Sequence, residues 1–222
     1  IMILIERPGV LRSAPIGIAA ALAFLLPLRW FHQQALAPLQ YQRTASETAF
    51  FSAPLEGAFS TSAWNRVWGA ATENLRSIVE GDLFPGVTVL GLAALSLLGL
   101  KGEPGRRRVV LGFTALAACA WLVALGPEVR LFGRPLFPGP FALLREFEAF
   151  RMIRVPARAS VFLGLGLAML AAIGLDRVRR TSWRVAFLAL ALIEATVAPL
   201  NVVAADRCID AAEPVPPIYL WL

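Results

Sequence analysis

The sequence predicts an all-α integral membrane protein, a polytopic helix bundle with about five transmembrane helices and interfacial helices in its outer loops. Hydrophobic residues make up 58% of the chain and charged residues only 16%. The mean hydropathy is +0.66. These apolar residues gather in long runs, which is typical of membrane proteins and not of soluble domains.

Five runs approach the roughly 20 apolar residues that a helix needs to cross about 30 Å of hydrocarbon. They cover residues 15–30, 84–100, 109–125, 159–175 and 185–203. We therefore expect residues 1–205 to form the transmembrane helix bundle. The first run is the shortest, and Pro27 and Arg29 lie at its end. We expect residues 206–222 to begin an extracytoplasmic segment, and the chain to be a fragment of a longer protein.

The charges predict how the bundle is oriented. The connections 101–108 and 176–184 each carry four basic residues and one acidic residue. The positive-inside rule places both in the cytoplasm, so the N-terminus of the fragment is expected inside and its C-terminus outside. In such a protein a net charge of +6 indicates contact with lipid headgroups, and no nucleic-acid partner is expected.

The two predicted outer loops, 31–83 and 127–158, differ in charge. The first contains five acidic residues and three arginines, as the rule expects of an outer loop. The second contains six arginines and three glutamates, which is against the rule. It also has a possible short amphipathic helix over 141–150, and we expect a surface-lying or re-entrant element there.

The surplus arginine is concentrated in the stretch EAFRMIRVPAR, residues 148–158, in which Pro156 disfavours a helical conformation at Val155. Arg151, Arg154 and Arg158 are candidates for binding a lipid headgroup or the phosphate of a lipid-linked donor, because a guanidinium fork matches phosphate oxygens. The alternative is ordinary anchoring to bulk phospholipid.

Two acids lie next to these arginines. We expect Glu146 and Glu148 to neutralise them and not to act as a catalytic base.

Glu194 is an acid well inside an apolar run. Its ionised form costs about 2–4 kcal/mol in a membrane, so it needs a partner or a proton. One interpretation is a proton relay or a substrate pocket. The other is a structural ion pair with Arg154 or Arg158.

Other candidate sites are few. His32 is the only histidine, and we expect it to be a polar residue at the end of the first span. No metal-site spacing, phosphate-binding loop or nucleophile elbow occurs, so no metal or cofactor is expected. In the fourth run Gly164, Ala168 and Ala172 recur every four residues, which predicts a helix-packing stripe.

Several phrases together carry a family resemblance, namely FSAPLEGAFST, EGDLFPGVTVLGLAALSLLGL, FEAFRMIRVPARASVFLGLGLAMLAAIGLDRV and PVPPIYLWL. In this order they resemble the C-terminal half of bacterial multispanning proteins of the GT-C glycosyltransferase superfamily, which includes protein O-mannosyltransferase-like enzymes. The FRMIRVPAR phrase is the most specific of them.

The resemblance implies a bacterial inner-membrane enzyme that transfers a sugar from a polyprenyl-phosphate donor on the extracytoplasmic side. Such enzymes carry their catalytic acid in an early outer loop, so the catalytic residue is expected outside this chain and stays unknown. The alternatives are a lipid or polysaccharide transporter or flippase component with Glu194 as its coupling site, or a non-catalytic membrane scaffold.

Overall fold

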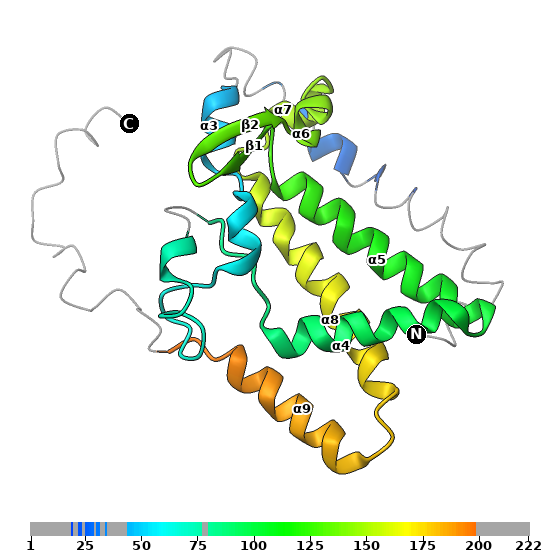
Figure 1. Cartoon of the computed structure of the whole chain (residues 1–222). Coiled ribbons are helices and arrows are strands. Elements are labelled where there is room, and N and C mark those ends of the chain that lie inside the picture. Colours follow the sequence, from blue (N-terminus) through cyan, green and yellow to red (C-terminus); the bar gives the residue numbers. More distant parts are fainter. Residues whose placement is uncertain are drawn as a thin grey trace, which may run out of the picture.

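A computed structural model describes residues 44–76 and 80–198, together with scattered positions between residues 19 and 34. The described part is mostly helical (Figure 1). His32, residues 206–222 and half of the predicted span 15–30 lie outside the described residues.

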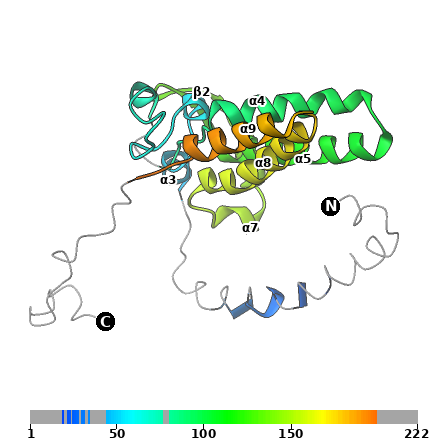
Figure 2. The ribbon, with the colours of Figure 1, turned by 90° about the horizontal axis from the view of Figure 1, so that it is seen from below.

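Four helices form the bundle (Figures 1 and 2). They are α4 (Val87–Leu97), which the 3-10 turn η4 (Leu98–Lys101) continues, α5 (Pro104–Ala124), α8 (Ser160–Asp176) and α9 (Thr181–Glu194). α8 packs against both α4 and α5, while α9 contacts mainly α4. Each helix overlaps one predicted apolar run. The last prediction is too long, because α9 ends at Glu194 although the apolar run continues to residue 203.

Two of these helices are long and apolar enough to cross a membrane, namely Pro104–Ala124 and Pro156–Asp176, which joins the 3-10 turn η5 (Pro156–Ala159) to α8. In the most apolar window of each, only 22% is buried inside the protein. On α8, Val161, Phe162 and Leu165 are exposed. An apolar helix with so exposed a surface favours contact with a membrane. The other three predicted spans stay predictions.

The packing face of α8 differs from the predicted one. Gly164, Ala168 and Ala172 are exposed, so they form no packing stripe among the described residues. The buried small residues are Gly166, Ala171 and Gly174. A Cβ at Gly166 would lie 3.0 Å from the Phe113 carbonyl oxygen on α5, and one at Gly174 would clash with the Leu92 carbonyl on α4.

The two basic connections lie at the same end of the described bundle. Arg106 forms an ion pair with Asp176 at 3.2 Å and donates to the Ile173 carbonyl at 3.0 Å. These contacts join the start of α5 to the end of α8.

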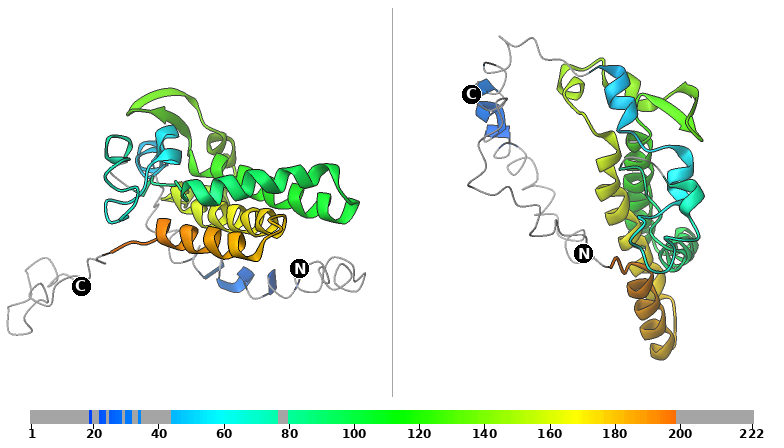
Figure 3. Two further views of the ribbon diagram at one scale, coloured as in Figure 1. Left: turned by 60° about the horizontal axis from the view of Figure 1, so that its bottom comes forward. Right: turned by 90° about the vertical axis from the view of Figure 1, so that its left-hand side faces the viewer.

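A layer of short elements covers the opposite end (Figures 1 and 3). We call this layer, residues 44–76, 80–86 and 126–159, the cap. Besides η5 it contains α3 (Ala45–Phe50), η2 (Leu55–Phe59), η3 (Glu73–Leu75), β1 (Glu128–Leu131), β2 (Arg134–Pro138), α6 (Pro140–Leu144) and α7 (Glu148–Arg151). The Ala53 amide donates to the Ala124 carbonyl at 2.8 Å, which fixes the cap to the end of α5.

The cap corrects the prediction of a purely helical chain, because β1 and β2 form an antiparallel hairpin. Phe132 and Gly133 make its two-residue turn with φ of 48° and 75°, the geometry of a type I′ turn. β2 is exposed along its whole length, and such an edge strand tolerates Pro135 and Pro138. Two short helices, α6 and α7, replace the single helix predicted over 141–150.

Two backbone positions follow expectations from residue type. Val155, before Pro156, has φ −123° and ψ 81°, outside the helical region. Gly86, before α4, has φ 99° and ψ 154°, a conformation open almost only to glycine. A Cβ at Gly86 would also lie 2.6 Å from Glu194 Oε2.

We therefore expect Gly86→Ala to destabilise the full-length protein by about 1–3 kcal/mol, through backbone strain and the clash with the carboxylate. Thermal unfolding in detergent, followed by circular dichroism, measures the effect. Gly91→Ala is the matched control, because Gly91 lies inside α4 with open space around its Cβ position. It should leave stability unchanged or raise it by about 0.5–1 kcal/mol. Equal effects of the two substitutions would contradict the assigned role of Gly86.

Candidate functional site

Arg154 makes two contacts within the cap. Its Nε lies 3.0 Å from Glu47 Oε1 on α3, and its guanidinium carbon lies 4.5 Å from the centre of the Phe51 ring. The Arg154 side chain remains 51% exposed. The ion pair and the cation–π contact hold it over the first cap segment while leaving part of the guanidinium open.

Arg158 forms a two-pronged ion pair with Glu80. Its Nε and Nη2 donate to the two carboxylate oxygens, both at 2.7 Å. This hydrogen bonding lowers the pKa of the Glu80 carboxyl below its ordinary value of 4.5. Both side chains are exposed.

Arg151 is bound by backbone oxygens. Its Nε donates to the Arg145 carbonyl at 3.0 Å and its Nη2 to the Glu146 carbonyl at 3.4 Å, so it closes the loop between α6 and α7. The predicted neutralising role of Glu146 and Glu148 is not seen at Arg154 and Arg158, whose carboxylate partners are Glu47 and Glu80. The side chain of Glu148 lies outside the described residues.

The ion pairs of the cap give a physical reason for its surplus arginine. Arginines of residues 127–158 pair with acids of residues 44–80, and the Phe132 amide of the hairpin turn donates to Glu56 Oε1 at 2.8 Å. The segment 127–158, in which arginines outnumber acids, thus contacts the segment 44–80, in which acids outnumber arginines. Two arginines of residues 127–158 are thus neutralised by acids of the other segment.

Glu194 is 5% exposed and binds the start of another helix. Its Oε2 accepts a hydrogen bond of 2.9 Å from the Thr88 amide, in the first turn of α4. The residue before α4 is Gly86, which has no side chain to cap the helix. The carboxylate takes over that function, and the positive end of the helix dipole stabilises its charge. The predicted ion pair of Glu194 with Arg154 or Arg158 is therefore wrong, although a structural role is favoured.

Asn65 completes this junction, and the sequence analysis missed it. Its Nδ2 donates to the Glu194 carbonyl at 2.7 Å, and its Oδ1 accepts from the amides of Val67 and Trp68 at 3.0 and 2.8 Å. An asparagine two or three residues before such amides signals a local turn, which the sequence shows. Its contact with residue 194 is long-range, and no local pattern reveals it.

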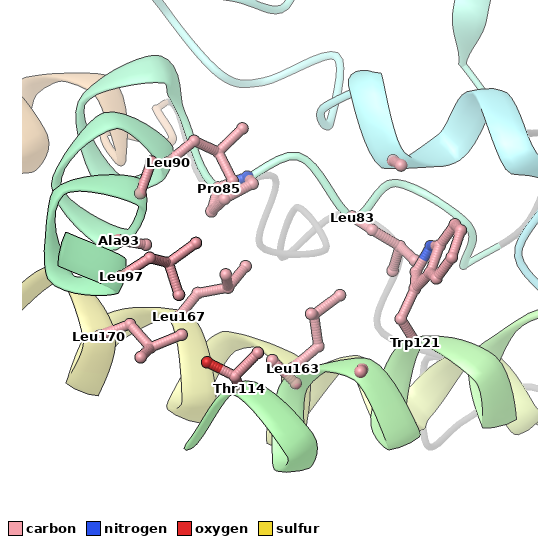
Figure 4. A pocket seen from close by; sticks show the side chains of 14 residues that line it. Leu83, Pro85, Leu90, Ala93, Leu97, Thr114, Trp121, Leu163, Leu167 and Leu170 are labelled. Atoms are coloured by element: carbon pink, nitrogen blue, oxygen red, sulfur yellow. The ribbon is translucent and has the colours of Figure 1, made fainter. Parts of the chain in front are cut away.

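An apolar groove lies between α4, α5 and α8, and the Leu83–Pro85 segment of the cap also lines it, with Leu83 toward Trp121 and Pro85 toward Leu90 (Figure 4). Its volume is about 400 Å³. Leucines of α4 and α8 line it, and Trp121 of α5 lies at the end nearest Leu83. Its lining residues include Leu90, Leu97, Trp121, Leu163, Leu167 and Leu170. None of the described residues that line the groove is charged.

No protein-family model, curated protein or solved structure matches the chain.

Two substitutions of Glu194 separate the effect of its charge from the effect of its hydrogen bond to the Thr88 amide. Glu194→Gln keeps an oxygen that accepts the Thr88 amide and loses only the interaction of the charge with the helix, so we expect a loss of about 0.3–1 kcal/mol. Glu194→Leu leaves that amide unpaired and should cost about 1–3 kcal/mol more. Thermal unfolding of the full-length protein in detergent compares the two. If both variants are as stable as the wild type, Glu194 does not hold α9 to α4.

The Glu80–Arg158 pair gives a pH dependence. Because the folded-state pKa of Glu80 lies below 4.5, the pair stabilises the folded protein above that pH and loses its effect as the pH falls through the lowered pKa. A double-mutant cycle with Glu80→Gln and Arg158→Gln should show favourable coupling at neutral pH and none in acid. Coupling that persists when Glu80 is protonated would contradict this assignment.

Proposed function

We propose that this chain is part of a membrane glycosyltransferase that uses a polyprenyl-phosphate-linked sugar, and that the cap faces the extracytoplasmic side. The observation that carries the proposal is the position of Arg151, Arg154 and Arg158. Arg151 and Arg154 lie in a short stretch of the cap just before the membrane-length helix Pro156–Asp176, and Arg158 lies in the first turn of that helix.

The orientation follows from charge. The connections 101–108 and 176–184 lie together at one end of the bundle, and their basic residues favour the cytoplasmic side. The cap covers the other end. A donor phosphate at the outer headgroup level then lies beside the arginines.

The present partners of the arginines do not prevent them from binding a phosphate. Exposed ion pairs contribute little to stability, because water competes for both charges. A phosphate offers more acceptor oxygens than a carboxylate and binds a guanidinium fork in the same two-pronged way. In this mechanism, the donor displaces Glu47 from Arg154, and the acid or base of the transfer step comes from outside the chain.

The contacts of Glu194 favour this proposal over transport coupled through that residue. A coupling acid must change its protonation and its contacts during the cycle, whereas Glu194 is buried and bound to the end of a helix.

Arg154 provides the sharpest test. In the full-length protein, Arg154→Ala should raise the KM for the lipid-linked donor about tenfold or more. This is the loss of affinity expected when one or two charge-assisted hydrogen bonds to the donor are removed. Glu47→Gln should leave that KM unchanged or lower it, because it frees the guanidinium. Arg134→Ala, in the exposed strand β2, is the control that removes a cap arginine elsewhere.

The outcome separates phosphate binding from anchoring. If Arg154 only holds α3, Arg154→Ala and Glu47→Gln should weaken the fold alike and neither should act on the donor selectively. That result, or an unchanged KM in Arg154→Ala, would overturn the proposed donor site. No sugar transfer by the intact wild-type protein with any polyprenyl-phosphate donor would overturn the enzyme assignment as a whole.

A further inference from the structure

The two basic connections hold a large excess of positive charge at one end of the bundle. Residues 101–108 and 176–184 each carry four basic residues and one acidic residue, so their combined excess equals the formal net charge of the whole chain, +6. Most of these basic side chains are exposed, whereas three arginines are half-buried, namely Arg106, Arg177 and Arg184. Since burial takes water away from a charged group, the half-buried arginines need partners.

Two of the three have them. Arg184 donates to the carbonyls of Asp176 and Val178 at the end of α8, at 2.9 and 2.6 Å. Arg106 donates to the Ile173 carbonyl at 3.0 Å and pairs with the Asp176 carboxylate at 3.2 Å. Both arginines therefore have structural roles at the end of α8.

Arg177 differs from these two. Among the residues that the structure describes, no carboxylate pairs with Arg177 and no oxygen accepts a hydrogen bond from its side chain. Its Nε is buried, but its two terminal nitrogens are not among the fully buried atoms, so a ligand can reach them. Within the described part of the chain, the cost of half-burying this cation is not compensated by any anion.

A second guanidinium lies beside the first. Arg177 Nη2 and Arg106 Nε lie 3.1 and 3.7 Å from the position that a Cβ would take at Gly99, so the two side chains meet over the same glycine. Asp176 balances only one of the two charges, and its side chain is 66% exposed, which weakens its ion pair with Arg106. The pair of arginines thus has one positive charge more than its described neighbours balance.

A phosphate group fits this place in both charge and position. Guanidinium groups bind phosphate oxygens through short, charge-assisted hydrogen bonds. The start of α5 has no side-chain cap, so the positive end of its helix dipole adds to the attraction. The arginines lie where one membrane-length helix, Pro104–Ala124, begins and the other, Pro156–Asp176, ends. The ends of such helices lie at the level of the lipid headgroups, where phosphate is the common anion.

We propose that Arg106 and Arg177 form a binding site for the phosphate of one anionic phospholipid at the cytoplasmic surface. The terminal nitrogens of Arg177 donate to the phosphate, which supplies the counter-ion that the described residues do not. This inference rests on the membrane orientation in the proposed function and not on sugar transfer. The site lies at the opposite end of the bundle from the cap, so it is distinct from the donor site proposed there.

The test is native mass spectrometry of the full-length protein in detergent, titrated with phosphatidylglycerol or with phosphatidylcholine. We expect the first phosphatidylglycerol to bind the wild type more tightly than phosphatidylcholine does, because choline cancels the phosphate charge. Arg177→Gln should weaken this first binding about tenfold, the effect of losing one or two charge-assisted hydrogen bonds. Arg179→Gln is the matched control, because Arg179 is an exposed arginine of the same connection. It should weaken the first binding less than twofold.

Thermal unfolding in detergent gives a second readout. Without lipid, Arg177→Gln should leave the melting temperature unchanged or raise it, because it removes a half-buried charge with no described partner. Added phosphatidylglycerol should then raise the melting temperature of the wild type more than that of Arg177→Gln, because a ligand stabilises the folded state that binds it. This reversal separates a binding residue from one that only supports the fold.

Three results would overturn the inference. One is an effect of Arg177→Gln on lipid binding no larger than that of Arg179→Gln, which would mean that lipid responds to the charge of the connection as a whole. Another is equal binding of phosphatidylglycerol and phosphatidylcholine. The last is displacement of phosphatidylglycerol by an equimolar amount of inorganic phosphate, which would assign the site to a soluble anion. Because sugar transfer is not measured, failure of the enzyme proposal leaves these outcomes unaffected.

Discussion

The structure depends most on the contact between the Glu194 carboxylate and the start of α4. Through it the end of α9 supplies the cap that Gly86 lacks, and the same residue accepts the amide of Asn65 through its backbone. One residue thereby joins two bundle helices and the loop above them. A hydrogen bond at the positive end of a helix offsets part of the cost of burying this carboxylate, and Glu194 has no ion pair within the part of the chain that the structure describes.

Sequence alone predicted approximately where the described bundle helices lie, but it did not predict the hairpin of the cap. An apolar run of membrane length is a local signal, and α4, α5, α8 and α9 each begin or end near a predicted limit. The hairpin gave no such signal, because Pro135 and Pro138 disfavour a strand and Phe132-Gly133 is a weak turn sequence. The packing face of α8 was also missed, since it depends on where Leu92 of α4 approaches.

The sequence identified the three arginines of the candidate site but not the groups that they contact. The sequence singled out Arg151, Arg154 and Arg158 because the positive-inside rule, applied to each loop separately, does not expect so many arginines in residues 127–158. The carboxylate partners of Arg154 and Arg158 lie more than seventy residues earlier in the chain, and the acids of residues 31–83 were the available signal. Counting charged residues could not reveal the partner of the Glu194 carboxylate, because that partner is the backbone amide of Thr88.

The sequence of β2 has a consequence for the protein while it is being made. An exposed strand with an open edge is a template on which another chain can add a strand, and Leu136 and Phe137 increase that risk. Two of the five residues of β2 are prolines, which have no amide to donate. The prolines that hid the strand from sequence analysis thus protect the nascent chain against aggregation through its only described sheet.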